Sequence, residues 1–250
     1  MQEITTIIIT LNEEKNIREC IESVKKISNE IIVVDSKSTD DTVSIAKELG
    51  ARVIVQSYLG DGPQKAFAEE FAKNDWILSL DADERLDTNA VQAITSLNLD
   101  KSKYDSYSLA RKTFIGDRFI KLWYPDRLLR LYDRKSAGYT KEIGHASVKA
   151  KKTYALQADI LHYSYENYFQ MISTVPKFAN RGAKMMDSKG KIAHWYDPML
   201  HGGFTFLKKL FVKGGAFHGM DGWNVSFISG FNTYMKYAIL LELQESKGQD

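Results

Sequence analysis

Two aspartates directly follow a short apolar segment, and their type and spacing suit a divalent cation. Residues 76–80 are mostly apolar, and Asp81 and Asp83 come immediately after them, two positions apart. Carboxylate oxygens are preferred ligands of Mg²⁺ and Mn²⁺, and a cation with open coordination positions can bridge to substrate phosphates. The same residues also fit a turn and helix N-cap before residues 88–97. The sequence therefore predicts a Mg²⁺ or Mn²⁺ site that needs support from other residues.

Polar side chains also end two earlier apolar segments. Thr10, Asn12 and Glu13 end the first of them, and Asp35 closes the segment 31–34. A carboxylate at the end of a strand can accept hydrogen bonds from the base or ribose of a nucleoside. Asp35 is therefore a candidate for binding a nucleotide.

The elements that must position these side chains alternate between strands and helices. Apolar β-branched runs predict strands, and apolar residues at helical spacing predict helices. The strands are expected at 4–11, 31–34, 52–56 and 76–80, and the helices at 17–27, 42–49, 63–73 and 88–97. This alternation predicts a layered α/β fold, with a mainly parallel sheet flanked by helices. Because ligands bind at the carboxyl ends of the strands in such sheets, the three polar clusters should meet at one edge.

In the second half of the chain, strand and helix patterns alternate less clearly. Residues 107–112 and 128–132 are predicted strands, and residues 163–186 are predicted to be helical. No repeat or Pro/Ser-rich linker separates the halves,. We therefore expect one domain, with the nucleotide-binding and catalytic part in residues 1–150 and a mainly helical extension in residues 151–250.

The composition of the chain excludes some classes of binding partner and some cellular locations. The chain has 34 basic and 32 acidic residues, a net charge of +2, so no overall field would attract nucleic acid,. Its one cysteine, Cys20, cannot form an internal disulfide, and the first residues lack the features of a signal peptide,. The longest apolar runs fall far short of the roughly 20 residues that cross a bilayer. We expect a cytoplasmic protein that does not bind nucleic acid.

Three motifs in sequence order resemble those of the family 2 glycosyltransferases. They are T-x-N-E at 10–13, V-D-x-x-S-x-D-x-T at 34–42 and D-x-D at 81–83, and the resemblance covers roughly residues 4–95. Further segments look like the branch of lipopolysaccharide core β-glucosyltransferases. These are D-A-D-E at 81–84, G-x-G-P-Q-K at 60–65, Y-P-D-R at 124–127, R-L-Y at 130–132 and D-G at 221–222.

The resemblance implies a GT-A fold, which is Rossmann-like, and an inverting transfer from a nucleotide diphosphate sugar. UDP-hexose is the implied donor, and a saccharide or lipid-linked saccharide of the lipopolysaccharide core or another cell-surface glycan is the implied acceptor. The residues implied to bind the donor are Thr10, Asn12, Glu13, Asp35, Ser36, Lys65 and Asp81. Lys65 would neutralise the diphosphate, and Asp83 with Asp81 would bind the metal. Ser36 departs from the second aspartate common in the family.

The reaction also needs a general base, because the acceptor hydroxyl must lose its proton as it attacks the sugar. Glu142 matches the glutamate of the branch motif V-H-E, although Lys141 replaces the histidine. A solvated loop glutamate paired with Lys141 is the alternative, and Asp126 is the second candidate base. The five histidines show no metal-ligand spacing, so structural roles are expected for most of them,.

Two arginines near the middle of the chain are further candidates for donor binding. Arg127 and Arg130 lie beside Trp123 and Tyr124. A guanidinium group matches the oxygens of a phosphate, and it can also stack on a sugar or an aromatic ring. Structural ion pairing is the equal alternative.

Residues 199–220 contain no acidic side chain. Lys208, Lys209 and Lys213 alternate there with phenylalanine and leucine. This pattern predicts peripheral contact with anionic lipid, on the inner face of the cell membrane. A following apolar stripe could instead pack on the protein's own core or on a second subunit; its residues are Phe227, Phe231, Tyr234, Ala238 and Leu241.

Other function classes remain open. A metal-dependent phosphohydrolase also uses D-x-D, but it usually carries its nucleophilic aspartate after the first strand, where this chain has 10–12, Thr-Leu-Asn. A nucleotidyltransferase also binds phosphates at a sheet edge, although no P-loop or dinucleotide motif is present,. A non-catalytic module that binds a nucleotide sugar is the third alternative, and product formation would separate it from an enzyme.

Overall fold

The computed structural model describes residues 3–140 and 147–247, and the chain divides into two compact units. The sheet unit comprises Met1–Thr113 and Tyr124–Tyr163. The helical unit comprises Phe114–Trp123 and Ser164–Asp250. Each unit therefore contains two separate stretches of chain.

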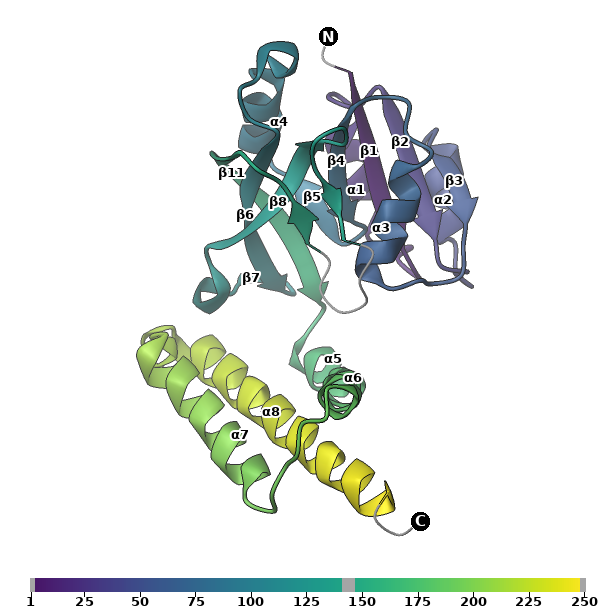
Figure 1. The fold of residues 1–250 in the computed structure, drawn as a ribbon. Coiled ribbons are helices and arrows are strands. Elements are labelled where there is room, and N and C mark those ends of the chain that lie inside the picture. Colours follow the sequence, from purple (N-terminus) through teal and green to yellow (C-terminus); the bar gives the residue numbers. More distant parts are fainter. Residues whose placement is uncertain (1–2, 141–146, 248–250) are drawn as a thin grey trace. The chain divides into compact units, whose positions relative to one another are not determined.

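The first part of the sheet unit alternates strands and helices, as the sequence predicts (Figure 1). Its elements are β1 (Ile4–Thr10), α1 (Ile17–Val24), β2 (Glu30–Asp35), α2 (Thr42–Glu48), β3 (Arg52–Val55), α3 (Asp61–Glu69), β4 (Trp76–Asp81), β5 (Glu84–Leu86), α4 (Thr88–Thr95) and η1 (Leu99–Lys101). The strands that follow are β6 (Ser106–Ile115), β8 (Asp126–Asp133), β9 (Gly138–Tyr139), β10 (Val148–Lys149) and β11 (Thr153–Tyr165).

The main sheet has the strand order β3-β2-β1-β4-β8-β6-β11-β5. Neighbouring strands from β3 to β4 are parallel, whereas β8 pairs antiparallel with both β4 and β6, and β11 pairs antiparallel with β5. The predicted α/β class with flanking helices and a helical extension is confirmed. Its parallel part is the half that alternates with helices, because a parallel connection needs a crossover.

Both faces of the parallel strands are covered. Ile8 and Val33 pack in one apolar core with residues of α1, α2 and α4. Ile7 and Ile32 pack on the opposite face, in a core with residues of α3. Successive residues of a strand point to opposite faces, so strands that are apolar throughout require this double cover.

The helical unit contains β7 (Arg118–Phe119) and all the helices described after residue 163. Its elements continue with η2 (Lys121–Trp123), α5 (Tyr168–Ser173), α6 (Val175–Ser188), α7 (Asp197–Leu207), the π-helical turn η3 (Lys208–Val212), η4 (Gly215–Phe217) and α8 (Gly219–Lys247). Sheet structure extends to Tyr165 on β11. The change from sheet to helices thus comes later than the expected boundary at residue 150, and residues 163–165 are strand rather than helix.

Helices α7 and α8 approach closely through two glycines. A Cβ atom at Gly202 would lie 3.1 Å from the carbonyl oxygen of Gly230, and one at Gly230 would lie 2.8 Å from Cβ of Phe206. A larger residue at either position would force the helices apart. Within the described part of the chain, none of the helices is long and apolar enough to cross a membrane.

Candidate active site

The ends of three neighbouring strands bring the predicted polar clusters together. Thr10 on β1 is in register with Asp35 on β2, and Ile9 is in register with Asp81 on β4. Asp81 is the last residue of its strand, as Asp35 is of β2. The predicted convergence at the carboxyl edge of the parallel sheet is therefore confirmed.

Two loops at this edge are held together by hydrogen bonds. The backbone N–H of Asn12 donates to Oγ of Ser38 at 2.8 Å, and Oδ1 of Asn12 accepts from the backbone N–H of Thr39 at 2.8 Å. Asn12 and Lys37 have φ values of 55° and 67°, in the left-handed region that few non-glycine residues adopt,. Such strained conformations persist where the surroundings fix them, and they concentrate at functional sites.

Asp35 is buried at the base of these loops. Its side chain is 1% exposed, and its two oxygens accept from the backbone N–H and the hydroxyl of Ser38 at 2.9 and 2.5 Å. Ser36, next to it, accepts a hydrogen bond from Nε2 of Gln64. A carboxylate has about four acceptor positions, so Asp35 retains capacity for a ligand.

Thr10 and Glu13 also lie at this edge of the sheet. Among residues 3–140 and 147–247, no group hydrogen-bonds the buried hydroxyl of Thr10. Burial raises the pKa of Glu13, and the nearby negative charges of Asp83, Asp40 and Asp81 add to this effect, while a hydrogen bond from Asn16 opposes it. The edge is thus rich in negative charge.

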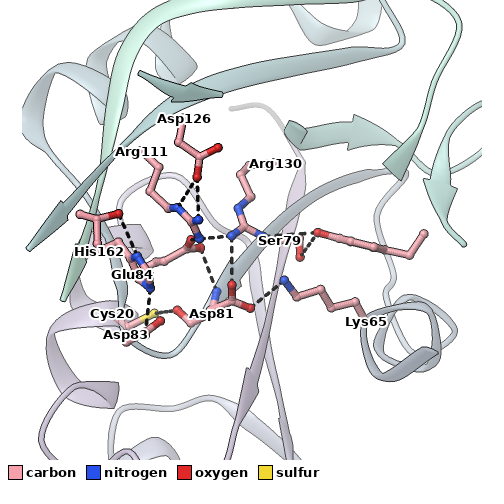
Figure 2. Close-up of polar contacts among 12 residues, drawn as sticks. Cys20, Lys65, Ser79, Asp81, Asp83, Glu84, Arg111, Asp126, Arg130 and His162 are labelled. Carbon is pink, nitrogen blue, oxygen red and sulfur yellow. Dashed lines mark hydrogen bonds and ion pairs between the residues drawn. The ribbon is translucent and has the colours of Figure 1, made fainter. Parts of the chain in front are cut away.

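Asp81 is paired with two buried cations (Figure 2). Its Oδ1 lies 2.6 Å from Nζ of Lys65, and its Oδ2 lies 3.0 Å from Nη2 of Arg130. Burial alone would raise the pKa of Asp81, but the charges of Lys65 and Arg130 outweigh burial and hold this pKa well below its usual range. Lys65, which the resemblance implies for the diphosphate, thus forms an ion pair with Asp81.

Arg130 also forms an ion pair with a second carboxylate, in the interior of the sheet unit (Figure 2). Its side chain is only 5% exposed, and Nη2 lies 2.5 Å from Oε1 of Glu84, which is fully buried. Arg111 lies 3.5 Å from the same Glu84 oxygen and 2.6 Å from Oδ2 of Asp126. Arg130 thus holds two carboxylates, which is the structural pairing that the sequence left open, and Asp126 is engaged by a guanidinium group.

Arg127 differs from Arg130 although both lie on β8. Its side chain is exposed, and Nη1 donates to the backbone carbonyl of Leu156 at 3.1 Å. A backbone carbonyl carries no full charge, so among the described residues no carboxylate neutralises the positive charge of Arg127. Of the two arginines, Arg127 is thus the one whose charge a ligand could reach.

Asp83 lies beside a histidine that the sequence patterns did not select. Nε2 of His162 on β11 is 3.1 Å from Oδ2 of Asp83 (Figure 2). Nδ1 of His162 is 3.2 Å from the hydroxyl of Thr113. A metal-ligating histidine is commonly oriented by such a partner on its second nitrogen. Across the described ranges, no cluster of three or more His, Cys, Asp or Glu side chains could hold a metal. Asp83 and His162 offer two adjacent donors, enough for a cation that is shared with phosphate oxygens and water.

The residues that sequence reasoning missed have no local signal. His162 reaches the site because it is in register with Glu84, through the antiparallel pairing of β11 with β5. Glu84 belongs to the D-A-D-E motif, but only its burial reveals that it pairs with Arg130. Glu142, the predicted base, lies outside the described residues.

Comparison with known proteins identifies the family. The family model "Glycosyl transferase family 2" matches residues 5–152, a range that contains all three strand ends of the site. The chain belongs to glycosyltransferase family 2. Membership of this family excludes the two alternative enzyme classes, the metal-dependent phosphohydrolase and the nucleotidyltransferase.

Relatives of this family 2 chain extend over nearly its whole length. An uncharacterized glycosyltransferase of Rickettsia prowazekii is 36% identical over 259 residues, which cover 97% of this chain and 88% of the relative. The lipopolysaccharide core biosynthesis glycosyltransferase LpsC of Rhizobium meliloti is 26% identical over 253 residues, covering 94% and 93%. The crystal structure of S. aureus TarS 1-349 superposes with a TM-score of 0.51 at 16% identity, covering 95% of this chain and 91% of TarS. This likeness confirms the predicted GT-A fold.

Proposed function

We propose that this family 2 glycosyltransferase moves a sugar from a nucleotide diphosphate sugar, UDP-hexose in the first instance, to a saccharide acceptor, with inversion at the anomeric carbon. The observation that carries the proposal is the meeting of Thr10, Asp35 and Asp81 at the carboxyl ends of three adjacent strands. In open α/β sheets this edge is where nucleotides bind.

The nucleoside is proposed to bind against Asp35 and the interlocked loops that carry Asn12, Glu13 and Ser36. The buried Thr10 hydroxyl supports this, because no described group bonds it and an unsatisfied buried hydroxyl costs about 1–3 kcal/mol,. A ligand hydroxyl or carbonyl there would remove that penalty. The strained φ values of Asn12 and Lys37 mean that the loops are held in one conformation before the donor arrives,.

The diphosphate is proposed to bind at Asp83 and His162, which would hold Mg²⁺ or Mn²⁺ between them. When bound, the cation offsets the negative charge that develops on the leaving nucleoside diphosphate. Thr113 would fix the orientation of the imidazole through its contact with Nδ1. Asp81, already paired with Lys65 and Arg130, is left to a ribose hydroxyl rather than to the metal.

The acceptor is proposed to be a saccharide of the lipopolysaccharide core or another cell-surface glycan. The similarity to a relative named as a lipopolysaccharide core biosynthesis glycosyltransferase supports this class. Glu142 is proposed to take the proton of the attacking hydroxyl. Asp126 is the weaker candidate, since Arg111 already binds its carboxylate.

Calorimetric titration of the full chain with UDP, with and without Mn²⁺, tests the donor and metal sites together. Wild-type protein should bind UDP more tightly when Mn²⁺ is present. Asp83→Ala should lose that metal-dependent gain, whereas Asp100→Ala, which removes an exposed carboxylate in η1, should behave as wild type. Equal metal dependence in Asp83→Ala and wild type would refute the metal assignment.

Catalysis needs a separate measurement, because a non-catalytic module would also bind the donor. The chain should release UDP from a UDP-hexose when an extracted core saccharide is supplied. Tight donor binding without any UDP release, over a panel of donors and acceptors, would favour the non-catalytic alternative.

A further inference from the structure

One face of α7 is exposed and entirely apolar. Four of its exposed residues are Met199, Leu200, Phe204 and Leu207. At about 100° per residue they fall within an arc of about 140°. The exposed Phe211 and Val212 continue the apolar surface on η3. We use the name outer face of α7 for Met199, Leu200, Phe204, Leu207 and Phe211.

The other side of α7 is already occupied. Gly202 packs against Gly230 and Tyr234 of α8, and the ring of Phe206 lies 6.4 Å from Trp223 and 6.5 Å from Phe227. The outer face is therefore not a surface that α7 could bury by rolling against α8. Phe204 and Phe211 remain 62% and 61% exposed. Contiguous exposed apolar side chains of this size mark a contact with another surface.

The charges around this face select the kind of surface. Residues 198–235 contain three lysines, Lys208, Lys209 and Lys213, and a single acidic residue, Asp221. Asp221 is occupied, because it lies 3.5 Å from Nε of Arg118 and accepts a hydrogen bond from Tyr168. Asp197, just before the segment, accepts from the backbone N–H of His194. The face thus carries positive charge that no neighbouring carboxylate of the described residues neutralises.

The lysines do not contribute equally. Lys208 and Lys213 are exposed at the C-terminal end of the outer face. Lys209 instead donates a hydrogen bond to Ser229 of α8 at 2.8 Å, and burial lowers its pKa. The basic patch predicted from the sequence therefore reduces to two accessible charges, Lys208 and Lys213.

We propose that the outer face of α7 lies on a membrane surface that contains anionic lipid, with Lys208 and Lys213 at the level of the headgroups. An apolar face bounded by lysines matches the way interfacial helices bind, with apolar side chains in the acyl boundary and cations near phosphates. A second copy of this chain would present the same positive charge, so a lipid surface is the better match. The contact does not depend on the donor or on catalysis.

Vesicle co-sedimentation of the full chain tests the proposal. The chain should bind vesicles of phosphatidylcholine mixed with phosphatidylglycerol, bind pure phosphatidylcholine weakly, and detach as salt rises. Lys208→Gln with Lys213→Gln should weaken binding roughly 30-fold. The matched control, Lys25→Gln with Lys26→Gln, removes two exposed lysines of the sheet unit and should leave binding unchanged.

The apolar contribution is tested by Phe204→Gln and Leu207→Gln. Each should weaken vesicle binding about tenfold or more, because each removes a side chain that the lipid would bury. Both side chains are exposed, so the circular dichroism spectrum and the UDP affinity should stay at wild-type values. Binding that is indifferent to these changes, or equal for charged and neutral vesicles, would overturn the proposal. The proposal would also be overturned if the wild-type chain bound no vesicles and instead formed a dimer in light scattering that Phe204→Gln abolished.

Discussion

The Arg130→Met variant probes the buried ion pairs beneath the site. Arg130 forms ion pairs with Asp81 at 3.0 Å and with Glu84 at 2.5 Å, and both Arg130 and Glu84 are buried. Without the guanidinium of Arg130, the one remaining ion-pair partner of Glu84 among the described residues is Arg111, at 3.5 Å. Breaking a buried pair from one side costs about 3–5 kcal/mol, because the remaining charge is left without its partner.

Unfolding measurements give this loss directly. For a chain of this size about 1 kcal/mol moves the melting temperature by about 2–4 °C, so the expected fall is about 6–20 °C. Calorimetry should place the change in the transition of the sheet unit. Lys135→Met, which breaks the solvent-exposed pair with Asp75, is the control and should leave the transition close to wild type,.

A double-mutant cycle separates the ion pair from other effects. Adding Glu84→Gln to Arg130→Met removes the uncompensated charge, so the double variant should be more stable than the sum of the single losses predicts. The introduced glutamine can still accept the hydrogen bond that Glu84 receives from the backbone N–H of Asp81. A loss below about 1 kcal/mol in Arg130→Met, or strictly additive losses, would refute the view that Arg130 acts by holding these carboxylates.

Two further variants address the chemistry. Glu142→Gln should lower turnover by about 10²-fold while the donor Kd barely changes, since loss of a general base removes an interaction of the transition state; near-normal turnover would move the assignment to Asp126. Asp35→Ala should weaken uridine nucleotides and UDP-hexose alike by about tenfold or more, because a buried charged acceptor is lost. Titrations of UMP and of the sugar donor check this, and a variant with unchanged UMP affinity would exclude Asp35 from the nucleoside site.

The sequence by itself determined the alternating strands and helices in the first part of the sheet unit, and the edge where its polar residues meet. Apolar periodicity identified the strands that became β1, β2 and β4, because that signal depends on neighbours a few positions away,. Once those strands are parallel, their carboxyl ends lie at one edge, so Thr10, Asp35 and Asp81 had to converge,. Local pattern and sheet geometry were sufficient for this part of the site.

Tertiary structure alone decided which of the charged residues pair with one another. Arg127 and Arg130 are three positions apart on β8, yet one is exposed and the other is buried against Asp81 and Glu84. Lys208 and Lys209 are adjacent, yet Lys209 is the one that bonds to Ser229 of α8. Residues three apart on a strand point to opposite faces, but packing between distant elements decides which face is covered, and residue type does not reveal that.

The pairing of His162 with Asp83 shows most clearly what could not be predicted from the sequence. The two residues are 79 positions apart, and they meet because β11 pairs with β5 in one register. A shift of one residue would turn the imidazole to the other face of the sheet. That register is set by packing over the whole sheet, so no local spacing of histidines and carboxylates in the sequence could encode it.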